Sequence, residues 1–236
     1  MKIGVFDSGR GGEAVAVRLR ELLPDSEVLT AHDSANVPYG SRSEAEVQRL
    51  TEAGIRPLLD AGCDTVVLAC NTATAAAIEH LRRQIPGIPF VGLEPMVKPA
   101  AAMSLSGVIA VCATPATLDS ARYAALKDRW APGVEVVEPD CRDWAASIER
   151  DGPESVDLSP LVETVRSSGA DAVVLACTHY HWIRDRIEGR LRADLPDRSV
   201  TVLEPSDAVA GQVARVLSQS AGRARGAASA ERGPVV

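Results

Sequence analysis

Short runs of β-branched and other apolar residues recur along the chain and are bounded by Gly, Asp or Pro. They cover residues 2–6, 27–31, 65–69, 90–93, 107–112, 134–137, 172–176 and 200–203. Segments rich in Ala, Leu, Arg and Glu with helical spacing lie between them, at 12–23, 44–61, 72–84, 115–130, 159–168 and 180–195. Buried strands that alternate with amphipathic helices predict parallel sheets covered on both faces.

An internal repeat divides this pattern into two halves. The segment 62–70 reads GCDTVVLAC, and the segment 169–177 reads GADAVVLAC. A weaker repeat relates residues 3–9 to residues 108–114. The sequence therefore predicts an α/β fold with two similar, doubly wound parallel-sheet domains. We expect pseudo-twofold symmetry between the domains and an active site in the cleft between them.

Two proline-containing segments indicate where the chain passes between the halves. Residues 95–99 contain two prolines, which interrupt any regular element, and Glu204-Pro205 marks the return. We expect a first domain at 1–97 and a second at 98–204. A helix at 207–217, within a return segment 205–219, completes the first domain. Residues 220–236 have no apolar periodicity and are expected to be a disordered tail.

Composition and charge limit the class of protein. The 236 residues are 46% hydrophobic, which is enough for a folded core, and the formal net charge of −7 argues against nucleic acid as a partner. We find no apolar run of membrane-spanning length and no signal-peptide pattern at the start, so we expect a cytoplasmic protein without membrane association. The five cysteines are an odd number, which favours free thiols over a disulfide framework.

The repeat places Cys70 and Cys177 at equivalent positions, each at the carboxyl end of a strand and at the start of the next helix. Ligands of doubly wound sheets bind at this edge. A helix N-terminus lowers the pKa of a thiol, and its N–H groups can hold a carboxylate. The alternative is that both cysteines are small buried residues. The polar residues that follow them, Asn71-Thr72 and Thr178-His179, favour the functional interpretation, with His179 as a proton partner.

Other candidate chemistry is weaker. Asp7 follows the first strand in the segment DSGRGG at 7–12, which lacks both common phosphate-loop patterns. It can either act on a group in the cleft or cap the first helix, and the spacing leaves both open. No Cys or His spacing is typical of a metal site, so we expect no metal. The three lysines, Lys2, Lys98 and Lys127, lie in poor positions for a Schiff base, so we expect no cofactor.

The chain resembles bacterial glutamate racemases of the aspartate/glutamate racemase superfamily over residues 3–217. The motifs that carry the resemblance are DSG with GG at 7–12, VPYG at 37–40, ACNT at 69–72, ATPAT at 113–117 and CTHY at 177–180. The resemblance implies racemisation of glutamate without pyridoxal phosphate, and it implies a D-glutamate product used for peptidoglycan. It also allows a homodimer.

The resemblance also implies a role for each site residue. Cys70 would exchange the proton of the D enantiomer with help from Asp7, and Cys177 that of the L enantiomer with help from His179 and Glu149. The implied substrate-binding residues are Asp7, Ser8, Tyr39, Gly40, Asn71, Thr72, Thr114, Thr117, Thr178 and His179.

The sequence departs from the family pattern at several positions, which leaves two other functions open. The departures are Arg10, Glu13, Ala176, His181-Trp182 and the segment 141–144 before Glu149. One alternative is a related racemase or isomerase that acts on aspartate, a hydantoin or a similar substrate. The other is a two-lobed protein that only binds a small molecule, which gives no reason for duplicated thiols.

Overall fold

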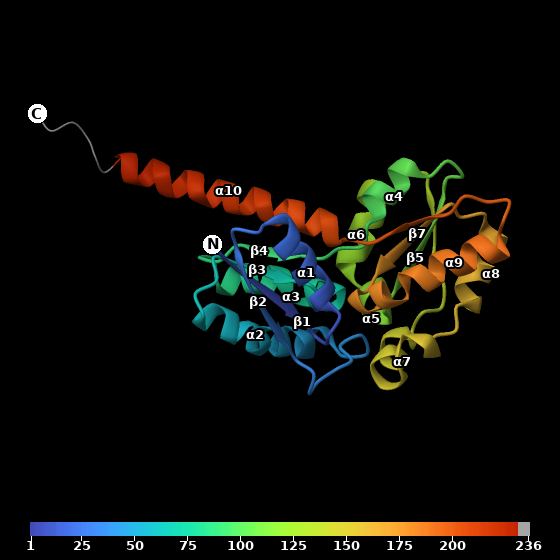
Figure 1. Ribbon diagram of the computed structural model, residues 1–236, viewed down its shortest axis with the longest axis horizontal. Helices are drawn as coiled ribbons and strands as arrows, with labels where there is room; N and C mark the ends of the chain where they lie inside the picture. Colours follow the sequence, from blue (N-terminus) through green and yellow to red (C-terminus); the bar gives the residue numbers. More distant parts are fainter. Residues whose placement is uncertain (231–236) are drawn as a thin grey trace, which may run out of the picture.

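Two four-stranded parallel sheets form the centre of the molecule (Figure 1). The computed structural model describes the backbone of residues 1–230 and the side chains of residues 1–219. The first sheet has the order β2-β1-β3-β4, and the second repeats it as β6-β5-β7-β8. The strands are β1 (Lys2–Asp7), β2 (Glu27–His32), β3 (Thr65–Leu68), β4 (Phe90–Gly92), β5 (Val108–Ala113), β6 (Glu135–Val137), β7 (Ala172–Ala176) and β8 (Thr201–Leu203). The predicted fold class is confirmed, because all eight expected strands occur and both sheets share one order.

Helices cover both faces of each sheet, and alternate strand residues decide which helices they meet. In the first half, Val66 and Leu68 pack under α2 (Glu44–Asp60) and α3 (Asn71–Gln84). Val67 points to the opposite face, under α1 (Gly12–Leu22) and α10 (Ser206–Ala230). Since strand side chains alternate between faces, Cys70 also lies on the α2 and α3 face.

The second half is built in the same way. One face of its sheet, which carries Ala172 and Val174, is covered by α4 (Val97–Met103) and α6 (Ala121–Trp130). The other face of β7 carries Val173 and Leu175 and is covered by α7 (Trp144–Asp151), α8 (Ser159–Ser168) and α9 (Arg184–Asp194). Cys177 packs on this second face, against the same helices.

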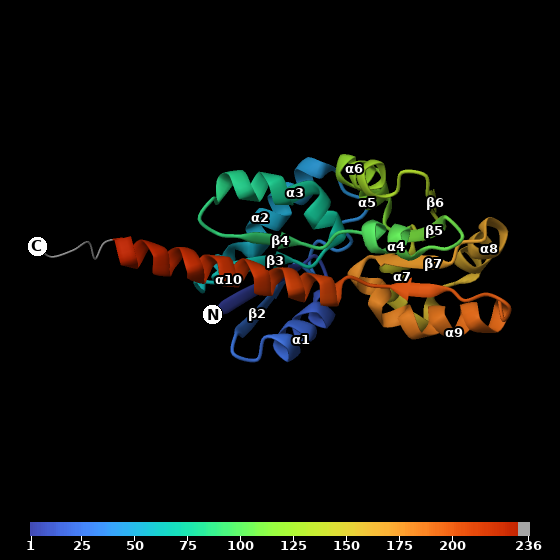
Figure 2. The same ribbon diagram turned by 90° about the horizontal axis from the view of Figure 1, so that it is seen from above.

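Strand register brings the ends of the central strands together. In the first sheet Phe6 of β1 pairs with Leu68 of β3, so the following residues, Asp7 and Ser8, lie beside Cys70. In the second sheet Ala113 pairs with Ala176, which sets Thr114 and Cys177 at one edge. Both polar edges lie where the two halves meet, as the views in Figures 1 and 2 show.

Several predicted helices differ from the structure. The expected helix 115–130 is divided into α5 (Pro115–Leu118) and α6, because the Ser120 hydroxyl accepts a hydrogen bond from the Tyr123 amide and starts a new helix. The expected helix 180–195 begins as the 3₁₀ helix η2 (Thr178–Ile183) and continues as α9. The sequence analysis did not predict α7 or the short 3₁₀ helix η1 (Pro153–Ser155).

The segment 95–99 is also more regular than expected. The helix α4 begins at Val97, and Pro99 lies in its first turn, where a missing N–H does not break a helical hydrogen bond. Val97 and Ala100 are buried against the second sheet. We therefore propose a domain boundary at 93–96, slightly before the boundary after residue 97 that the sequence indicated.

The C-terminal helix α10 returns to the first half, where Val209, Val213 and Leu217 pack with Ile3 and Leu19. Figures 1 and 2 show it running along the first sheet and past its end. It continues as helix to Ala230, whereas the sequence pattern indicated a disordered tail from residue 220. That segment is rich in Ala and Arg, which are strong helix formers. The rest of the expected tail, 231–236, lies outside the described residues.

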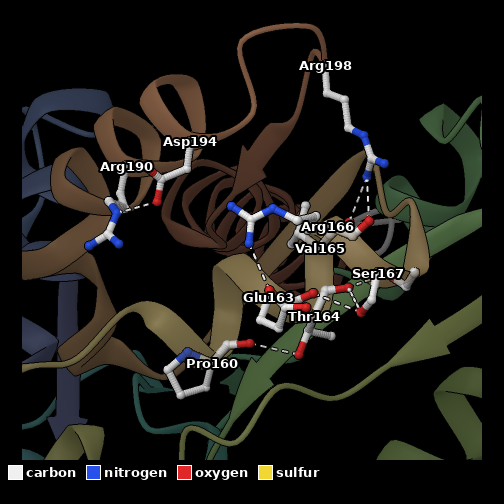
Figure 3. A network of polar contacts seen from close by, with 10 residues as sticks. Pro160, Glu163, Thr164, Val165, Arg166, Ser167, Arg190, Asp194 and Arg198 are labelled. Atoms are coloured by element: carbon white, nitrogen blue, oxygen red, sulfur yellow. Dashed lines mark hydrogen bonds and ion pairs between the residues drawn. The ribbon is translucent and has the colours of Figure 1, made fainter.

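A polar network holds the far side of the second half (Figure 3). The Arg198 guanidinium donates to the carbonyl oxygens of Val165 and Arg166, both at 3.0 Å. These carbonyls belong to the last turn of α8, where the Val165 oxygen also accepts from the Gly169 amide at 3.1 Å. Arg198 thus ties the loop before β8 to the end of α8.

Candidate active site

A single cavity between the halves contains both repeated cysteines. Its wall includes Ser8, Cys70, Asn71 and Thr72 from the first half and Thr114, Cys177, Thr178 and His179 from the second. The segment 37–40 completes the wall, together with Ala145 and Ala176. The sequence analysis did not identify Val37, Pro38 or Ala145 as site residues, because apolar wall positions carry no chemical signal in a sequence.

Cys70 is held at the N-terminus of α3. Its sulfur accepts a hydrogen bond from the Ala73 amide at 3.4 Å and lies 3.3 Å from the Ser8 hydroxyl. Burial, followed by the nearby charge of Asp7, raises the pKa of the Cys70 thiol to about 11. The prediction that the helix terminus lowers this pKa is therefore wrong, because desolvation of the thiolate outweighs the hydrogen bonds.

Cys177 lies at the equivalent position of the second half. It precedes η2, and its sulfur is 3.7 Å from Nδ1 of His179. Burial raises the pKa of the Cys177 thiol well above its ordinary value, and the proximity of Cys70 adds to this. A lowered pKa was predicted here too and is wrong for the same reason. A negative charge on Cys70 thus acts directly on the ionisation of Cys177.

His179 connects Cys177 to Glu149. Its Nε2 atom lies 2.6 Å from Oε1 of Glu149, which comes from α7. The loop after β1 approaches this pair closely, since a Cβ on Gly9 would lie 2.6 Å from that carboxylate oxygen. The backbone amide of Arg10 also donates to Glu149 Oε1, at 3.4 Å. The structure thus places Glu149 behind the cavity wall, in contact with His179, despite the atypical sequence that precedes it.

Asp7 combines the two interpretations that its sequence position left open. One carboxylate oxygen accepts hydrogen bonds from the amides of Gly9 and Gly12 at 3.2 and 3.1 Å, at the start of α1. The other accepts from the Thr178 hydroxyl at 3.2 Å, across the boundary between the halves. Burial raises the pKa of Asp7, while His179 and these hydrogen bonds act in the opposite direction. A negative charge on Asp7 raises the pKa of both cysteine thiols.

Three threonines meet across the same boundary. The Thr72 hydroxyl lies 3.0 Å from that of Thr114 and 3.4 Å from that of Thr117, and the last two are 3.1 Å apart. Gly40 packs on them, because a Cβ there would lie 2.9 Å from Thr114. The Gly40 carbonyl accepts from the Ala116 amide at 3.2 Å. Thr72 and Thr114 face the cavity, and Thr117 supports them from behind.

Asn71 and Tyr39 differ in what they can offer a ligand. Both side-chain polar atoms of Asn71 are buried without a hydrogen-bond partner, which is rare for buried polar groups unless a ligand uses them. The Tyr39 hydroxyl instead donates to Asp33 at 2.8 Å, and burial raises the pKa of Tyr39 far above its usual range. Asp33 was not predicted from the sequence, where its only signal was its place four residues before the motif at 37–40.

The described residues offer neither a cluster of metal ligands nor a lysine at the cavity wall. Within the part of the chain that the structure describes, no group of three or more His, Cys, Asp or Glu side chains is placed to hold a metal ion. The lysines lie away from the cavity wall. Lys2 contacts Glu27, Lys98 lies over Trp130, and Lys127 pairs with Glu138.

Comparison with known proteins agrees with this arrangement. Residues 12–213 match the family model described as Asp/Glu/Hydantoin racemase. The chain is 42% identical to a glutamate racemase of Ectopseudomonas mendocina, over 92% of this chain and 82% of that protein. It is 43% identical to a glutamate racemase of Roseiflexus sp., over 92% of this chain and 79% of that protein. The crystal structure of Escherichia coli glutamate racemase in complex with L-glutamate and the activator UDP-MurNAc-ala superimposes with a TM-score of 0.78, at 29% identity, over 92% and 82%. The chain belongs to the Asp/Glu/hydantoin racemase family.

Proposed function

We propose that this protein is a glutamate racemase that interconverts L- and D-glutamate without pyridoxal phosphate. The observation that carries the proposal is that Cys70 and Cys177, from equivalent positions of the duplicated halves, line one cavity. Two proton-transfer groups on opposite sides of an α-carbon are what a two-base racemisation requires. A protein that only binds a small molecule has no use for the second thiol.

In the proposed reaction, the thiolate of one cysteine removes the α-proton, and the thiol of the other donates its proton to the opposite face. The first cysteine ends as a thiol and the second as a thiolate, so protons and charge balance, and the reverse reaction exchanges their roles. Cys177 acts on L-glutamate, with His179 and Glu149 as its proton partners. Cys70 acts on D-glutamate, assisted by Asp7.

The raised thiol pKa values suit this chemistry. A thiolate with a higher pKa is a stronger base, which helps it to remove a weakly acidic α-proton. The cost is that little thiolate exists near neutral pH in the unliganded protein. The positively charged ammonium group of the substrate offsets part of this cost, since a nearby positive charge favours the thiolate.

Polar groups of the cavity wall hold the substrate. The free amide of Asn71 and the hydroxyls of Thr72 and Thr114 bind one end of the glutamate, and Ser8 and Thr178 bind the other. The backbone amides at the start of α3 add donors for a carboxylate. Tyr39, Gly40 and Thr117 shape the wall and support these groups.

The product D-glutamate would serve peptidoglycan synthesis in the cytoplasm. Among the helices of the described residues, none is both long and apolar enough to cross a bilayer. The partner proposed is the amino-acid substrate alone, with no nucleic acid or membrane. The proposal also allows a homodimer.

Incubation of the purified protein with L-glutamate in D₂O, without added cofactor, tests the proposal. We expect α-deuterated D-glutamate, detected by NMR and chiral chromatography, and the same end point starting from D-glutamate. Loss of turnover in a variant that carries both Cys70→Ser and Cys177→Ser is the control. Turnover of aspartate or a hydantoin but not glutamate would assign another substrate of the same family, and turnover of none of them would overturn the proposal.

A further inference from the structure

The His179 imidazole is held on a third side by an aromatic ring. Its two nitrogens face Cys177 and Glu149. The Trp182 indole contacts it edge to face, with ring centroids 5.6 Å apart and planes at 83°. Trp182 does not line the active-site cavity and has no part in the proposed reaction. It is one of the positions where this sequence departs from the family pattern.

The local backbone explains why these two rings meet. His179 and Trp182 lie three residues apart within η2, which is a 3₁₀ helix. A 3₁₀ helix has about three residues per turn, so side chains three apart stand directly above one another. In an α-helix, the same spacing would rotate Trp182 by about 60° away from His179. The 3₁₀ conformation of η2 thus aligns the indole with the imidazole.

Trp182 is partly exposed, whereas the imidazole that it contacts is buried. The indole residue is 39% exposed, whereas the His179 side chain is only 5% exposed. Trp182 also lines a neighbouring cavity of about 370 Å³, together with Asp7, Gly9 and Arg10. The indole is therefore placed between the His179 ring and the loop after β1, beside the site rather than in a hydrophobic core.

The indole and the loop after β1 confine the imidazole from two directions. A Cβ on Gly9 would lie 3.0 Å from Nε2 of His179, so the backbone there leaves no free space on that side. The Trp182 ring contacts the imidazole from another direction, beside the contact between Nε2 and Glu149. Exclusion of water strengthens the interaction of a charged pair, because the local dielectric constant falls.

We propose that Trp182 is a positioning residue for proton transfer at Cys177, which it serves by holding His179 against the thiol and shielding the His179–Glu149 contact from water. The proposal rests on the proposed racemase function. It predicts that replacement of the indole slows the proton transfer at Cys177 and leaves the transfer at Cys70 intact.

The kinetic test compares Trp182→Ala and Trp182→Leu with Trp182→Phe, and uses Trp130→Ala as a control at a tryptophan remote from His179. We expect kcat to fall about threefold to tenfold for Ala and Leu, on the scale of an aromatic contact. Phe should retain most activity, and KM and the control should change little. The α-deuterium isotope effect on kcat/KM should rise for L-glutamate and fall for D-glutamate, because the step at Cys177 becomes more rate-limiting.

A second measurement does not depend on turnover. Alkylation of Cys177 by iodoacetamide is followed against pH by peptide mass spectrometry in wild type, Trp182→Ala, Trp182→Leu and the Trp130→Ala control. Displacement of His179 removes a partner of the Cys177 thiolate. The pH midpoint of Cys177 alkylation should therefore rise in both Trp182 variants and stay unchanged in Trp130→Ala. An unchanged or lower midpoint, or isotope effects that change equally for both enantiomers, would overturn the proposal. A shifted midpoint in a protein that does not racemise glutamate would instead refute only the proposed function.

Discussion

Replacement of Glu149 tests whether the contact between Glu149 and His179 supports proton transfer at Cys177. Glu149→Gln removes the charge but keeps an amide oxygen that can accept from Nε2, now 2.6 Å from the carboxylate. Glu149→Ala removes both. The pair is well shielded, since the side chains of His179 and Glu149 are only 5% and 23% exposed. The contact should therefore retain most of the strength of a charged hydrogen bond.

The expected size follows from that strength. Hydrogen bonds to charged groups contribute about 1.5–3 kcal/mol, which corresponds to roughly 10- to 150-fold in rate if the whole contribution acts in the transition state. We expect a rate loss near the lower limit for Glu149→Gln, because the amide oxygen can still accept the hydrogen bond. The loss should be near the upper limit for Glu149→Ala. Both effects should appear in kcat, since Glu149 does not line the cavity.

Racemisation is measured in both directions by circular dichroism, with α-protonated and α-deuterated substrates. The isotope effect on kcat/KM should rise for L-glutamate only, because Cys177 removes the proton from that enantiomer. Glu163→Gln is a matched control, since Glu163 pairs with Arg166 on the surface of α8. A rate loss below about threefold in both Glu149 variants, or a loss of similar size in the control, would refute the assigned role of Glu149.

Further predictions concern the cysteines, Asp7 and the return segment. Cys70→Ser should abolish racemisation but leave slow α-deuterium exchange of L-glutamate alone, and Cys177→Ser should leave exchange of D-glutamate alone; equal exchange of both enantiomers by either variant would contradict the two-base assignment. Asp7→Asn should lower the pKa of the Cys70 thiol from about 11, because it removes a nearby negative charge, and the pH dependence of Cys70 alkylation measures the change. An unmoved midpoint would show that Asp7 does not act on Cys70. Burial opposes the charge of Glu204, but its polar partners lower its pKa from 4.5 to about 2. A lowered folded-state pKa stabilises the fold above pH 4.5, and this contribution, on the order of 1–2 kcal/mol after allowance for solvent screening, is lost as the pH falls towards 2. Thermal melts between pH 4.5 and pH 2 should thus show a smaller loss of stability for Glu204→Gln than for wild type. If the melting temperatures of the two proteins fall in parallel with pH, the effect is excluded.

Strand positions were predictable because buried parallel strands have a simple local signature. The runs at 65–69 and 172–176 are continuous, apolar and bounded by turn residues, and both occur as β3 and β7 almost unchanged. Helix ends were less predictable. The division between α5 and α6 depends on the Ser120 cap, and the start of α4 depends on Val97 packing against the second sheet. Packing of this kind involves residues far apart in the chain, which a local pattern does not contain.

The sequence by itself determined the duplication, the parallel-sheet class of both halves and the equivalent positions of Cys70 and Cys177, because repeats and apolar periodicity are properties of the chain, whereas the strand order came only from the structure. Only the tertiary structure decided the electrostatics of the site. The helix N-terminus predicted a lowered thiol pKa, whereas burial between the halves raises it, since desolvation depends on every group packed around the sulfur. The tertiary structure also decided that Glu149 and Trp182 meet at His179. Their contacts follow from how α7, η2 and the loop after β1 converge, and no spacing in the sequence measures that convergence.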